Sequence, residues 1–355
     1  MYLEQISTPA LIIDLNRMDA NMEYMQTIVD QSNAVLRPHY KSNKCIEVVQ
    51  RQLARGAKGI TCAKLSEAED LAEAGVEDVL IANQITDIDK IAKVAGLAKK
   101  CRLGIAVDHA ENVENLEKAA AAQDAVIYCL VEYEIGMKRC GVSTKEELYE
   151  LAKAIEKSPH LVFEGIQAYA GQLSHELSVK VRREKGEEVE KRLKEAKEYL
   201  EEHGVKVNQV SGCSTASVLD HASKDSVYTE FQAGSYIFMD TAYGALTDLK
   251  FGNTLFVLAT VISKAGGQTI TDVGRKAISM DQKEPVFVGY EDYPVKLSEE
   301  HSTVQLPADE KHIGDKMLMI PGHCCTCINI YDWVYFVRDG KVVNKVPVTS
   351  RGKSQ

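Results

Sequence analysis

The sequence lacks several features that would assign it to a broad class of proteins. It has no apolar run of membrane-spanning length, and its N-terminus has neither the basic region nor the apolar core of a secretion signal. It also lacks an excess of basic residues: the formal net charge is -10, which provides no positive field for nucleic acid. We therefore expect a cytoplasmic protein that binds neither membranes nor nucleic acid.

A disulfide framework is also missing, although the chain contains nine cysteines. An odd count without regular spacing is typical of free thiols in a reducing compartment. Most of these cysteines stand alone in strand-like runs, where a thiol behaves as a small buried hydrophobe. The exception is the cluster at 324–327, which directly follows His323.

The sequence does contain an alternation of short apolar runs with longer segments of helical periodicity. A helical segment such as 66–75 carries acids in its early turns and a glycine just past its end, as helix polarity favours. Strands separated by helices pair in parallel, and eight of them close a (β/α)8 barrel. The strands are expected near 34–40, 58–62, 78–82, 102–107, 126–132, 163–169, 207–211 and 229–235. An open doubly wound sheet is the alternative, but no G-x-G-x-x-G motif follows the first strand.

After about residue 246 the pattern changes to strands without long helices. The triplet Arg338-Asp339-Gly340 is typical of a hairpin turn. We therefore predict an α/β fold, with a TIM-type barrel over residues 16–245 and a mostly antiparallel β domain over residues 246–355. The strand-like segment 10–14 is expected to join the β domain, which would then include residues 1–15. The expected strands of this domain are 255–262, 286–288, 316–320, 333–337 and 342–343.

One lysine stands at the end of the first expected barrel strand, in Arg37-Pro38-His39-Tyr40-Lys41. An ammonium loses hydration in a partly buried place, which lowers its pKa and makes its amine usable for a Schiff base. The simpler interpretation of this segment alone is a solvated loop lysine. Lys41 is nevertheless our candidate for a catalytic and cofactor-binding amine. Lys44 is the competing lysine, expected at the start of a helix over 45–57.

Other polar side chains follow the expected barrel strands, at the edge that carries the active site in barrels. The loops after strands seven and eight usually bind phosphate there, because backbone N–H groups face the anion. Gly212 would permit close backbone approach, and Ser214 and Thr215 offer hydroxyls and an N-cap for a helix. Taken alone, such a segment is more often a plain helix start than a phosphate site. A phosphate at this end would suit a pyridoxal cofactor on Lys41. The candidates after the strands are Asn83, Arg139, Tyr169, His175, Gly212, Ser214, Thr215, Gly234, Ser235 and Tyr236.

The second cluster is Pro321-Gly322-His323-Cys324-Cys325-Thr326-Cys327. On an extended chain side chains alternate, so His323, Cys325 and Cys327 would share one side and Cys324 would face the other. An imidazole and a thiolate two residues apart make a half-site for Zn²⁺. A buried histidine beside packed cysteines is the structural alternative. The side chains that could complete a metal shell include Glu299, Glu300 and His301.

Together these segments resemble the D-threonine aldolase and D-serine dehydratase family. The likeness spans nearly the whole chain, and the lysine and histidine–cysteine segments are specific in combination. It is carried by Thr8-Pro9-Ala10, residues 37–41, Arg139-Cys140-Gly141-Val142, residues 234–236 and Pro321-Gly322-His323-Cys324. The resemblance implies an alanine-racemase-like barrel, a C-terminal β domain and pyridoxal 5'-phosphate as cofactor.

The resemblance also implies roles for individual residues. Lys41 would carry the cofactor, Arg139 would lie near its ring, and 212–215 with 234–236 would hold its phosphate. His323 and Cys325 fall on the family's two metal-ligand positions. Aldolases of this group typically show His-Cys-Asp there and dehydratases His-x-Cys, so this chain resembles the dehydratases at Cys325. A thiolate ligand favours Zn²⁺ over Mn²⁺ or Mg²⁺.

Two other stretches resemble the aldolases. Residues 169–175 keep the tyrosine-to-histidine spacing that makes His175 the base, and Ile330-Tyr331-Asp332-Trp333 also follows the aldolase branch. We therefore expect a homodimeric lyase that cleaves a D-β-hydroxy-α-amino acid, such as D-threonine, into glycine and an aldehyde. The alternatives are a D-serine dehydratase giving pyruvate and ammonia, an amino-acid racemase, and a non-catalytic pyridoxal-phosphate carrier. A structural or interaction protein is disfavoured, because it gives no reason for polar residues to gather at strand ends.

Overall fold

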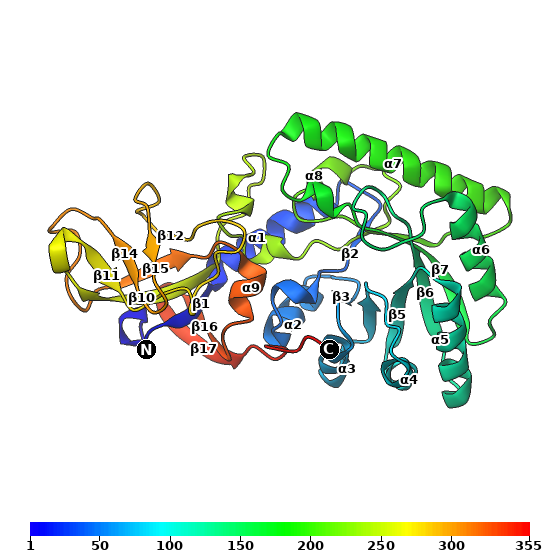
Figure 1. Cartoon of the computed structure of the whole chain (residues 1–355), viewed down its shortest axis with the longest axis horizontal. Helices are drawn as coiled ribbons and strands as arrows, with labels where there is room; N and C mark the ends of the chain where they lie inside the picture. Colours follow the sequence, from blue (N-terminus) through cyan, green and yellow to red (C-terminus); the bar gives the residue numbers. More distant parts are fainter. The chain divides into compact units, whose positions relative to one another are not determined.

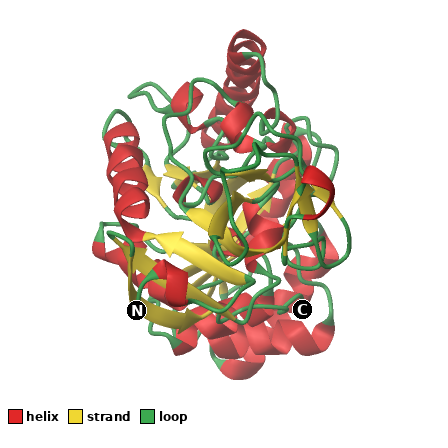
Figure 2. Ribbon diagram, turned by 90° about the vertical axis from the view of Figure 1, so that its left-hand side faces the viewer, coloured by secondary structure: helices red, strands yellow, loops and turns green.

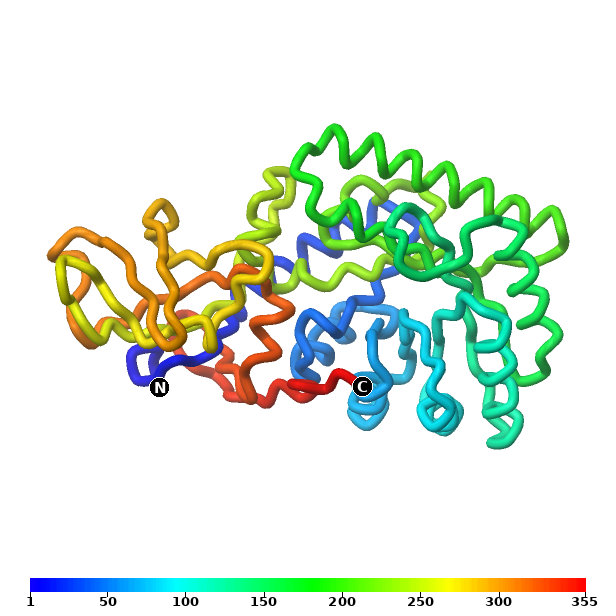
Figure 3. The backbone as a smooth tube through the Cα atoms, viewed as in Figure 1, coloured from blue at the N-terminus to red at the C-terminus, as the bar shows by residue number.

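The computed structural model describes all 355 residues and divides the chain into two compact units (Figure 1). The barrel unit comprises residues 26–41, 48–234 and 353–355, and the β unit comprises residues 1–25, 42–47 and 235–352. The chain passes between these units several times, along a path that the colours of Figure 3 trace. The domain boundaries expected from the sequence, 16–245 and 246–355, stay a prediction. None of the helices combines the length and the apolar character needed to cross a membrane.

Eight strands of the barrel unit form a single parallel sheet in the order β2-β9-β8-β7-β6-β5-β4-β3. They are β2 (Val35–Leu36), β3 (Ile60–Cys62), β4 (Asp78–Ile81), β5 (Arg102–Val107), β6 (Ile127–Glu132), β7 (Leu161–Ala168), β8 (Gln209–Gly212) and β9 (Glu230–Phe231). Each lies within or beside an apolar run, because β-branched side chains pack well on a buried sheet. All eight expected strands are present, although β2 and β9 are shorter than their runs.

Helices connect these strands, and Figure 2 shows helices in red around strands in yellow. They are α3 (Leu65–Glu73), α4 (Ile88–Leu97), α5 (Ala110–Gln123), α6 (Lys145–Glu156), α7 (Val179–Glu202) and α8 (Val218–His221). Local sequence sets their ends: Thr144 caps α6 by accepting the Glu147 N–H, and Gly75 follows α3 with a φ of 79°. The helices α1 (Leu15–Val29) and α2 (Ile46–Ala54) each contain residues of both units.

The two edges of the parallel sheet meet at a bridge between His39 and Thr61. The Thr61 N–H donates to the Pro38 carbonyl (3.0 Å), and the Lys58 N–H donates to the Leu36 carbonyl (2.8 Å). Beyond the end of β2 at Leu36, the Arg37 and His39 N–H groups still donate to the Phe231 and Ala233 carbonyls, whereas Pro38 has no N–H to give to the β3 side. The barrel expected from the sequence is therefore confirmed, with its seam between β2 and β3.

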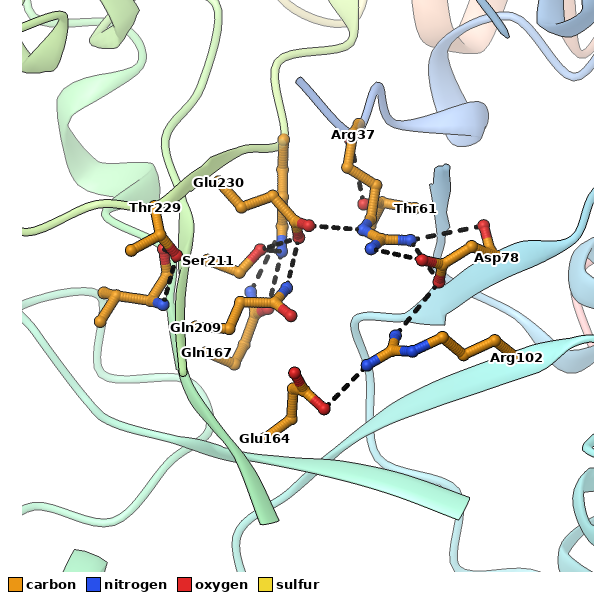
Figure 4. A network of polar contacts seen from close by, with 12 residues as sticks. Arg37, Thr61, Asp78, Arg102, Glu164, Gln167, Gln209, Ser211, Thr229 and Glu230 are labelled. Carbon is orange, nitrogen blue, oxygen red and sulfur yellow. Dashed lines mark hydrogen bonds and ion pairs between the residues drawn. The ribbon is translucent and has the colours of Figure 1, made fainter. Parts of the chain in front are cut away.

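A buried ion network lies where several barrel strands begin (Figure 4). The Arg37 guanidinium is 2% exposed and donates to Glu230 Oε2 (2.7 Å) and to Asp78 Oδ1 (2.8 Å). Arg102 in turn joins Asp78 to Glu164. Burial acts to raise the pKa of Asp78, but the hydrogen bonds and charges of Arg37 and Arg102 together hold that pKa below its usual value. Loss of one partner would leave a buried charge unpaired, at a typical cost of about 3–5 kcal/mol. The network therefore favours the arrangement of strands in which every charge keeps its partner.

The β unit contains one sheet of nine strands. Its main path is β13-β14-β11-β10-β1-β16-β17, and β15 pairs with both β10 and β12. The strands are β1 (Ala10–Asp14), β10 (Leu255–Ser263), β11 (Thr269–Thr271), β12 (Val286–Phe287), β13 (Lys296–Leu297), β14 (Ser302–Val304), β15 (Lys316–Ile320), β16 (Trp333–Arg338) and β17 (Lys341–Pro347). Three of them, β11, β13 and β14, were not expected from the sequence, since elements of two or three residues show no periodicity. β12 is equally short, but its apolar run at 286–288 indicated it.

The N-terminal strand lies inside the sheet of the β unit. β1 pairs antiparallel with β10 and parallel with β16, so the expectation that it joins this domain is confirmed. The pair β1 and β16 is the parallel exception in an otherwise antiparallel sheet. The expected hairpin turn is also present, since Asp339 and Gly340 both have positive φ between β16 and β17.

Candidate active site

Lys41 lies in the short 3₁₀ turn Tyr40–Ser42, beyond the end of β2. The sequence analysis placed it at the end of a strand over 34–40, and this detail is wrong because β2 stops at Leu36, before Pro38. The Lys41 N–H donates to His39 Nδ1 at 3.3 Å, which fixes the turn locally. The lysine is therefore held on a turn after a strand, rather than on the strand itself.

Two cations approach the ring of Tyr169, the residue that directly follows β7. Lys41 Nζ lies 5.5 Å from the ring centroid, and Arg139 Cζ lies 5.8 Å from it. Such cations are attracted by the electron-rich face of the ring. The Tyr169 hydroxyl lies 3.3 Å from Ser174 Oγ, which also ties the following loop to the ring. The structure thus brings together three residues that the sequence analysis assigned to the cofactor.

A buried carboxyl group at the end of β6 helps to position Arg139. Glu132 Oε1 lies 3.7 Å from Arg139 Nη2, and Glu132 Oε2 accepts a hydrogen bond from Gln84 Nε2 (2.5 Å). Burial raises the pKa of Glu132 above its usual value, even though Gln84 and Arg139 act to lower it. Sequence reasoning missed Glu132, because a single acid inside an apolar strand run gives no signal of its partner.

Two further candidates after barrel strands, His175 and Asn83, have different surroundings. His175 is exposed and follows the short turn Gly171–Leu173, and its neighbour Ser174 is buried against the Tyr169 hydroxyl. The peptide that carries His175 is therefore anchored at Tyr169. Asn83 donates through Nδ2 to the Ala63 carbonyl at 3.0 Å, a contact that stabilises the ends of β3 and β4.

The loop after β8 buries the two hydroxyl residues that the sequence analysis assigned to phosphate, Ser214 and Thr215. The Ser214 N–H donates to Ser217 Oγ (3.1 Å), and the Ser217 N–H donates to Ser214 Oγ (3.4 Å). The following helix, α8, begins at Val218, so its N-cap is Ser217 rather than Ser214 or Thr215. The N-cap suggested for those two residues is therefore wrong, because the reciprocal serine pair delays the helix start.

Glycine is required at position 212 of this loop for a structural reason. A Cβ at Gly212 would lie 2.0 Å from the Ala168 carbonyl oxygen, so the close contact of β7 with β8 requires glycine whether or not a ligand approaches. The loop after β9 contains Gly234, which ends the main part of the barrel unit, and Ser235 and Tyr236, which belong to the β unit. The Tyr236 carbonyl accepts Asn21 Nδ2 at 2.9 Å.

His323 and Cys325 do not lie on an extended chain. Cys324–Ile328 form the short helix α9, and His323 is the residue before it. The alternation that placed Cys327 on the same side as His323 and Cys325 is wrong here, because each helical residue turns the chain by about 100°. Cys327 is buried whereas Cys325 is partly exposed, and Cys324 is buried as a structural residue was expected to be.

Within the β unit, polar groups surround the Cys325 sulfur. Ser42 Oγ lies 3.5 Å from it, Ser235 Oγ 3.7 Å and Cys324 Sγ 3.9 Å. Hydrogen bonds from Cys324, and then from His323 and Ser42, hold the pKa of Cys325 well below its usual value in spite of burial. Burial acts to lower the pKa of His323, but the hydrogen bond and charge of Cys325 raise it to about 9. The thiolate that a metal needs is thus favoured, and metal binding would release the imidazolium proton.

An acid that the sequence analysis missed lies beside His323. Asp281 Oδ2 is 2.7 Å from His323 Nδ1, and Thr326 Oγ1 donates to Asp281 Oδ1 at 2.6 Å. Glu300, one of the acids suggested for the metal shell, instead pairs with Lys276 at 2.7 Å. The structure contains no group of three or more His, Cys, Asp or Glu side chains arranged for a metal. No sequence signal could find Asp281, because it lies 42 residues from His323 in a segment without periodicity.

The competing lysine, Lys44, has other partners. It precedes α2 with a φ of 46°, so its expected place inside that helix is wrong. Its Nζ donates to the Ser350 carbonyl (3.3 Å), and the residue is 9% exposed. Lys44 is thus engaged within the β unit, whereas the Lys41 amine lies beside the Tyr169 ring.

The residues present fit the two groups that the resemblance implied. Lys41 offers an amine for a pyridoxal aldehyde. Within the β unit, Asn43 Nδ2 is a buried donor without a protein acceptor, as expected where a ligand oxygen completes the bonding. His323 and Cys325 offer a nitrogen and a sulfur donor, the ligand set that suits Zn²⁺. Ser42, which contacts Cys325, is the residue directly after Lys41.

Family models match both parts of the chain. Residues 13–242 match the N-terminal domain of alanine racemase, and residues 254–337 match a putative serine dehydratase domain. Two relatives are each 36% identical: the 3-hydroxy-D-aspartate aldolase of Paracoccus denitrificans (strain Pd 1222), over 98% of this chain and 93% of the relative, and the D-threonine aldolase of an Arthrobacter species, over 99% and 95%. The crystal structure of D-threonine aldolase from Filomicrobium marinum has a TM-score of 0.94 and 33% identity, over 99% of this chain and 98% of that one.

These matches define the class of protein as one with an alanine-racemase-like barrel and a β domain of the serine dehydratase type. The chain belongs to this family, which includes D-threonine aldolase and 3-hydroxy-D-aspartate aldolase. A dehydratase is also related: the D-threo-3-hydroxyaspartate dehydratase of Delftia sp. (strain HT23) is 31% identical over 78% of this chain and 74% of the relative. The likeness to the two aldolases therefore covers more of the chain.

Proposed function

We propose that this protein is a pyridoxal-phosphate- and metal-dependent lyase that cleaves a D-β-hydroxy-α-amino acid into glycine and an aldehyde. The observation that carries the proposal is the 36% identity to two aldolases over nearly the whole chain, both units included. The cluster of Lys41, Arg139 and Tyr169 supports it, because these side chains supply an amine, a cation and an aromatic ring in one place. D-threonine is the first substrate to test.

In this proposal Lys41 would bind the aldehyde of the cofactor, and Tyr169 and Arg139 would contribute to the same site. The loop residues that would hold its phosphate are Gly212, Ser214, Thr215, Gly234, Ser235 and Tyr236. Pyridoxal phosphate, when bound, supplies an electron sink for the bond that breaks at the substrate Cα. Arg139, beside the Tyr169 ring, would also provide positive charge for the substrate carboxylate.

The remaining residues act on the substrate hydroxyl. His323 and Cys325 would hold a divalent metal, with Zn²⁺ favoured by the thiolate and Mn²⁺ or Mg²⁺ as alternatives, and a metal-bound hydroxyl has a lowered pKa. His175, directly or through one water, accepts the hydroxyl proton as the Cα–Cβ bond breaks. Its exposed side chain on a loop anchored at Tyr169 supports this role, because such a loop can reach a substrate proton.

A second candidate function is dehydration of a D-hydroxyamino acid such as D-serine to pyruvate and ammonia. It is favoured by the thiol at Cys325, which resembles the dehydratase branch, and by the related D-threo-3-hydroxyaspartate dehydratase. In that reaction Lys41 would remove the proton on Cα, and the hydroxyl would leave with metal assistance. The two functions differ in their products.

The first prediction concerns the product formed from D-threonine. The full chain, supplied with pyridoxal phosphate and Zn²⁺ or Mn²⁺, should release acetaldehyde and glycine in equal amounts, because Cα–Cβ cleavage yields one of each. Acetaldehyde is measured with a coupled reductase and glycine by chromatography. L-threonine is the matched control and should give at least about 100-fold less, since a difference of about 3 kcal/mol in transition-state binding suffices.

Parallel assays with D-serine and D-3-hydroxyaspartate distinguish the alternatives. Pyruvate and ammonia from D-serine, with no glycine from D-threonine, would replace the aldolase by the dehydratase. Interconversion of D- and L-amino acids that survives chelation would indicate a racemase instead. Failure of every D-amino acid together with a bound cofactor would favour a non-catalytic carrier.

The second prediction concerns His175. His175→Ala should lower kcat for D-threonine cleavage by roughly 10²–10⁴, the usual contribution of a general base, while the absorbance of the bound cofactor stays unchanged. The matched control is His203→Ala, which should leave kcat unchanged, because His203 is an exposed histidine at the C-terminal end of α7. Unchanged turnover in His175→Ala would remove the assignment.

We also propose a homodimer in the cytoplasm. The two-domain architecture resembles enzymes that work as dimers, and all nine cysteines are free thiols, as expected in a reducing compartment. Sedimentation of the loaded protein measures the oligomeric state directly.

A further inference from the structure

The His323 ring is held on one side by a carboxylate that no sequence motif indicates. Asp281 Oδ2 lies 2.7 Å from His323 Nδ1, and the His323 side chain is only 16% exposed. A histidine bound at Nδ1 has Nε2 as the nitrogen that can bind a metal. Cys325, the other proposed ligand, lies two residues further along the chain.

Asp281 is itself held in place from two directions. Thr326 Oγ1, one turn into α9, donates to Asp281 Oδ1 at 2.6 Å. The segment that carries Asp281 also packs tightly against the turn before His323: a Cβ at Gly322 would lie 1.8 Å from the Lys283 carbonyl oxygen. Ser279, in the same segment as Asp281, also binds the backbone of His323, since its hydroxyl donates to the His323 carbonyl at 2.6 Å. Gly322 is thus the residue that lets the acid reach the imidazole.

We propose that Asp281 is a positioning residue for the metal centre: by accepting the Nδ1 proton of His323 it fixes the tautomer that presents the Nε2 lone pair to the metal. A carboxylate behind a metal-binding histidine orients the ring and raises its basicity, and its loss typically lowers metal affinity about 10–100-fold. This inference rests on the proposed function only in taking His323 and Cys325 as the ligands.

The hydrogen-bond pattern gives a sharp expectation for the isosteric variant. The Thr326 hydroxyl has a good acceptor in Asp281 at 2.6 Å and a poor one in the His323 carbonyl at 3.4 Å. In Asp281→Asn the amide oxygen should therefore face Thr326, and the amide NH₂ should face His323. An NH₂ group there makes Nδ1 an acceptor and moves the ring proton to Nε2, where it blocks the metal.

The test measures Zn²⁺ and Mn²⁺ affinity of the full chain loaded with pyridoxal phosphate, by competition with a chromophoric chelator. Asp281→Ala should lose about 10–100-fold in affinity, and Asp281→Asn should lose at least as much although it keeps the shape of the side chain. The matched control is Glu117→Gln in the barrel unit, where Glu117 Oε1 makes the same kind of contact with His160 Nδ1, at 2.8 Å. This control should bind metal like the wild type.

A second readout reports the tautomer itself. Long-range ¹⁵N–¹H spectra of the metal-free protein, recorded at a pH high enough for the imidazole to be neutral, should show His323, assigned by its loss in His323→Ala, with the proton on Nδ1 in the wild type and on Nε2 in Asp281→Asn. Wild-type affinity in Asp281→Asn together with weak binding in Asp281→Ala would reduce Asp281 to a packing role and overturn the proposal. Wild-type affinity in both variants would also overturn it. Unchanged affinity in His323→Ala would instead overturn the metal pair, and with it that part of the proposed function.

Discussion

Lys41→Ala is expected to reduce the rate of D-threonine cleavage by about 10³-fold or more. The proposed covalent catalysis depends on this one side chain, so its removal abolishes nearly all of the rate enhancement that covalent catalysis gives. The bound cofactor should also lose its visible absorbance. Borohydride reduction of the wild type should fix pyridoxyl on the peptide that contains residue 41, where the amine lies 5.5 Å from the Tyr169 ring centroid. Kinetics, absorbance and peptide mapping together check the assignment.

Lys44 supplies the matched control, since it lies three positions along the same segment. Lys44→Met should keep the absorbance of the bound cofactor, because the Lys44 amine donates to the Ser350 carbonyl within the β unit. Some loss of stability is expected from that buried bond. A reduced adduct on residue 44, or on neither lysine, would remove the basis of the proposed cofactor site.

The second large effect is expected from the metal. Removal of the metal by a chelator, or His323→Ala, should slow D-threonine cleavage by about 10²–10⁴, since Lewis-acid assistance contributes several kcal/mol. Addition of Zn²⁺ or Mn²⁺ should restore the chelated wild type but not the variant. Turnover and metal content are measured on the same samples.

His301→Ala is the control for this experiment. His301 is exposed in the β unit and was one of the residues suggested for the metal shell. If only the proposed pair binds metal, this variant should turn over like the wild type. Full activity of metal-free wild-type protein would contradict a catalytic metal, whereas loss of metal in His301→Ala would add a third ligand.

Much of the barrel could be predicted because its signal is repeated along the chain. Each of its eight strands is an apolar run between helical segments, and parallel pairing follows from the helical crossovers. The details that failed depend on single residues. β2 ends at Leu36, and the serine pair Ser214 and Ser217 precedes α8, details that periodicity does not contain.

The histidine–cysteine segment shows the same limit more strongly. Residue types identified it as a candidate metal pair, but the assumption of an extended chain failed at α9. A five-residue helix is too short to show a 3.6-residue period, so its side-chain directions could not be inferred. Asp281, Ser42 and Ser235 were out of reach for another reason: each contacts the pair across a long stretch of sequence.

The sequence by itself determined the kinds of chemical group available: an amine at the expected end of a strand, a base on a loop, and a nitrogen–sulfur pair. It also determined the succession of elements, because hydrophobic periodicity is a local property. Only the tertiary structure decided which groups meet, since contacts such as Arg139 with Tyr169 or Asp281 with His323 join segments that the chain alone does not relate. Hydrogen bonds and charges act over a few ångströms of space, whatever the distance along the chain.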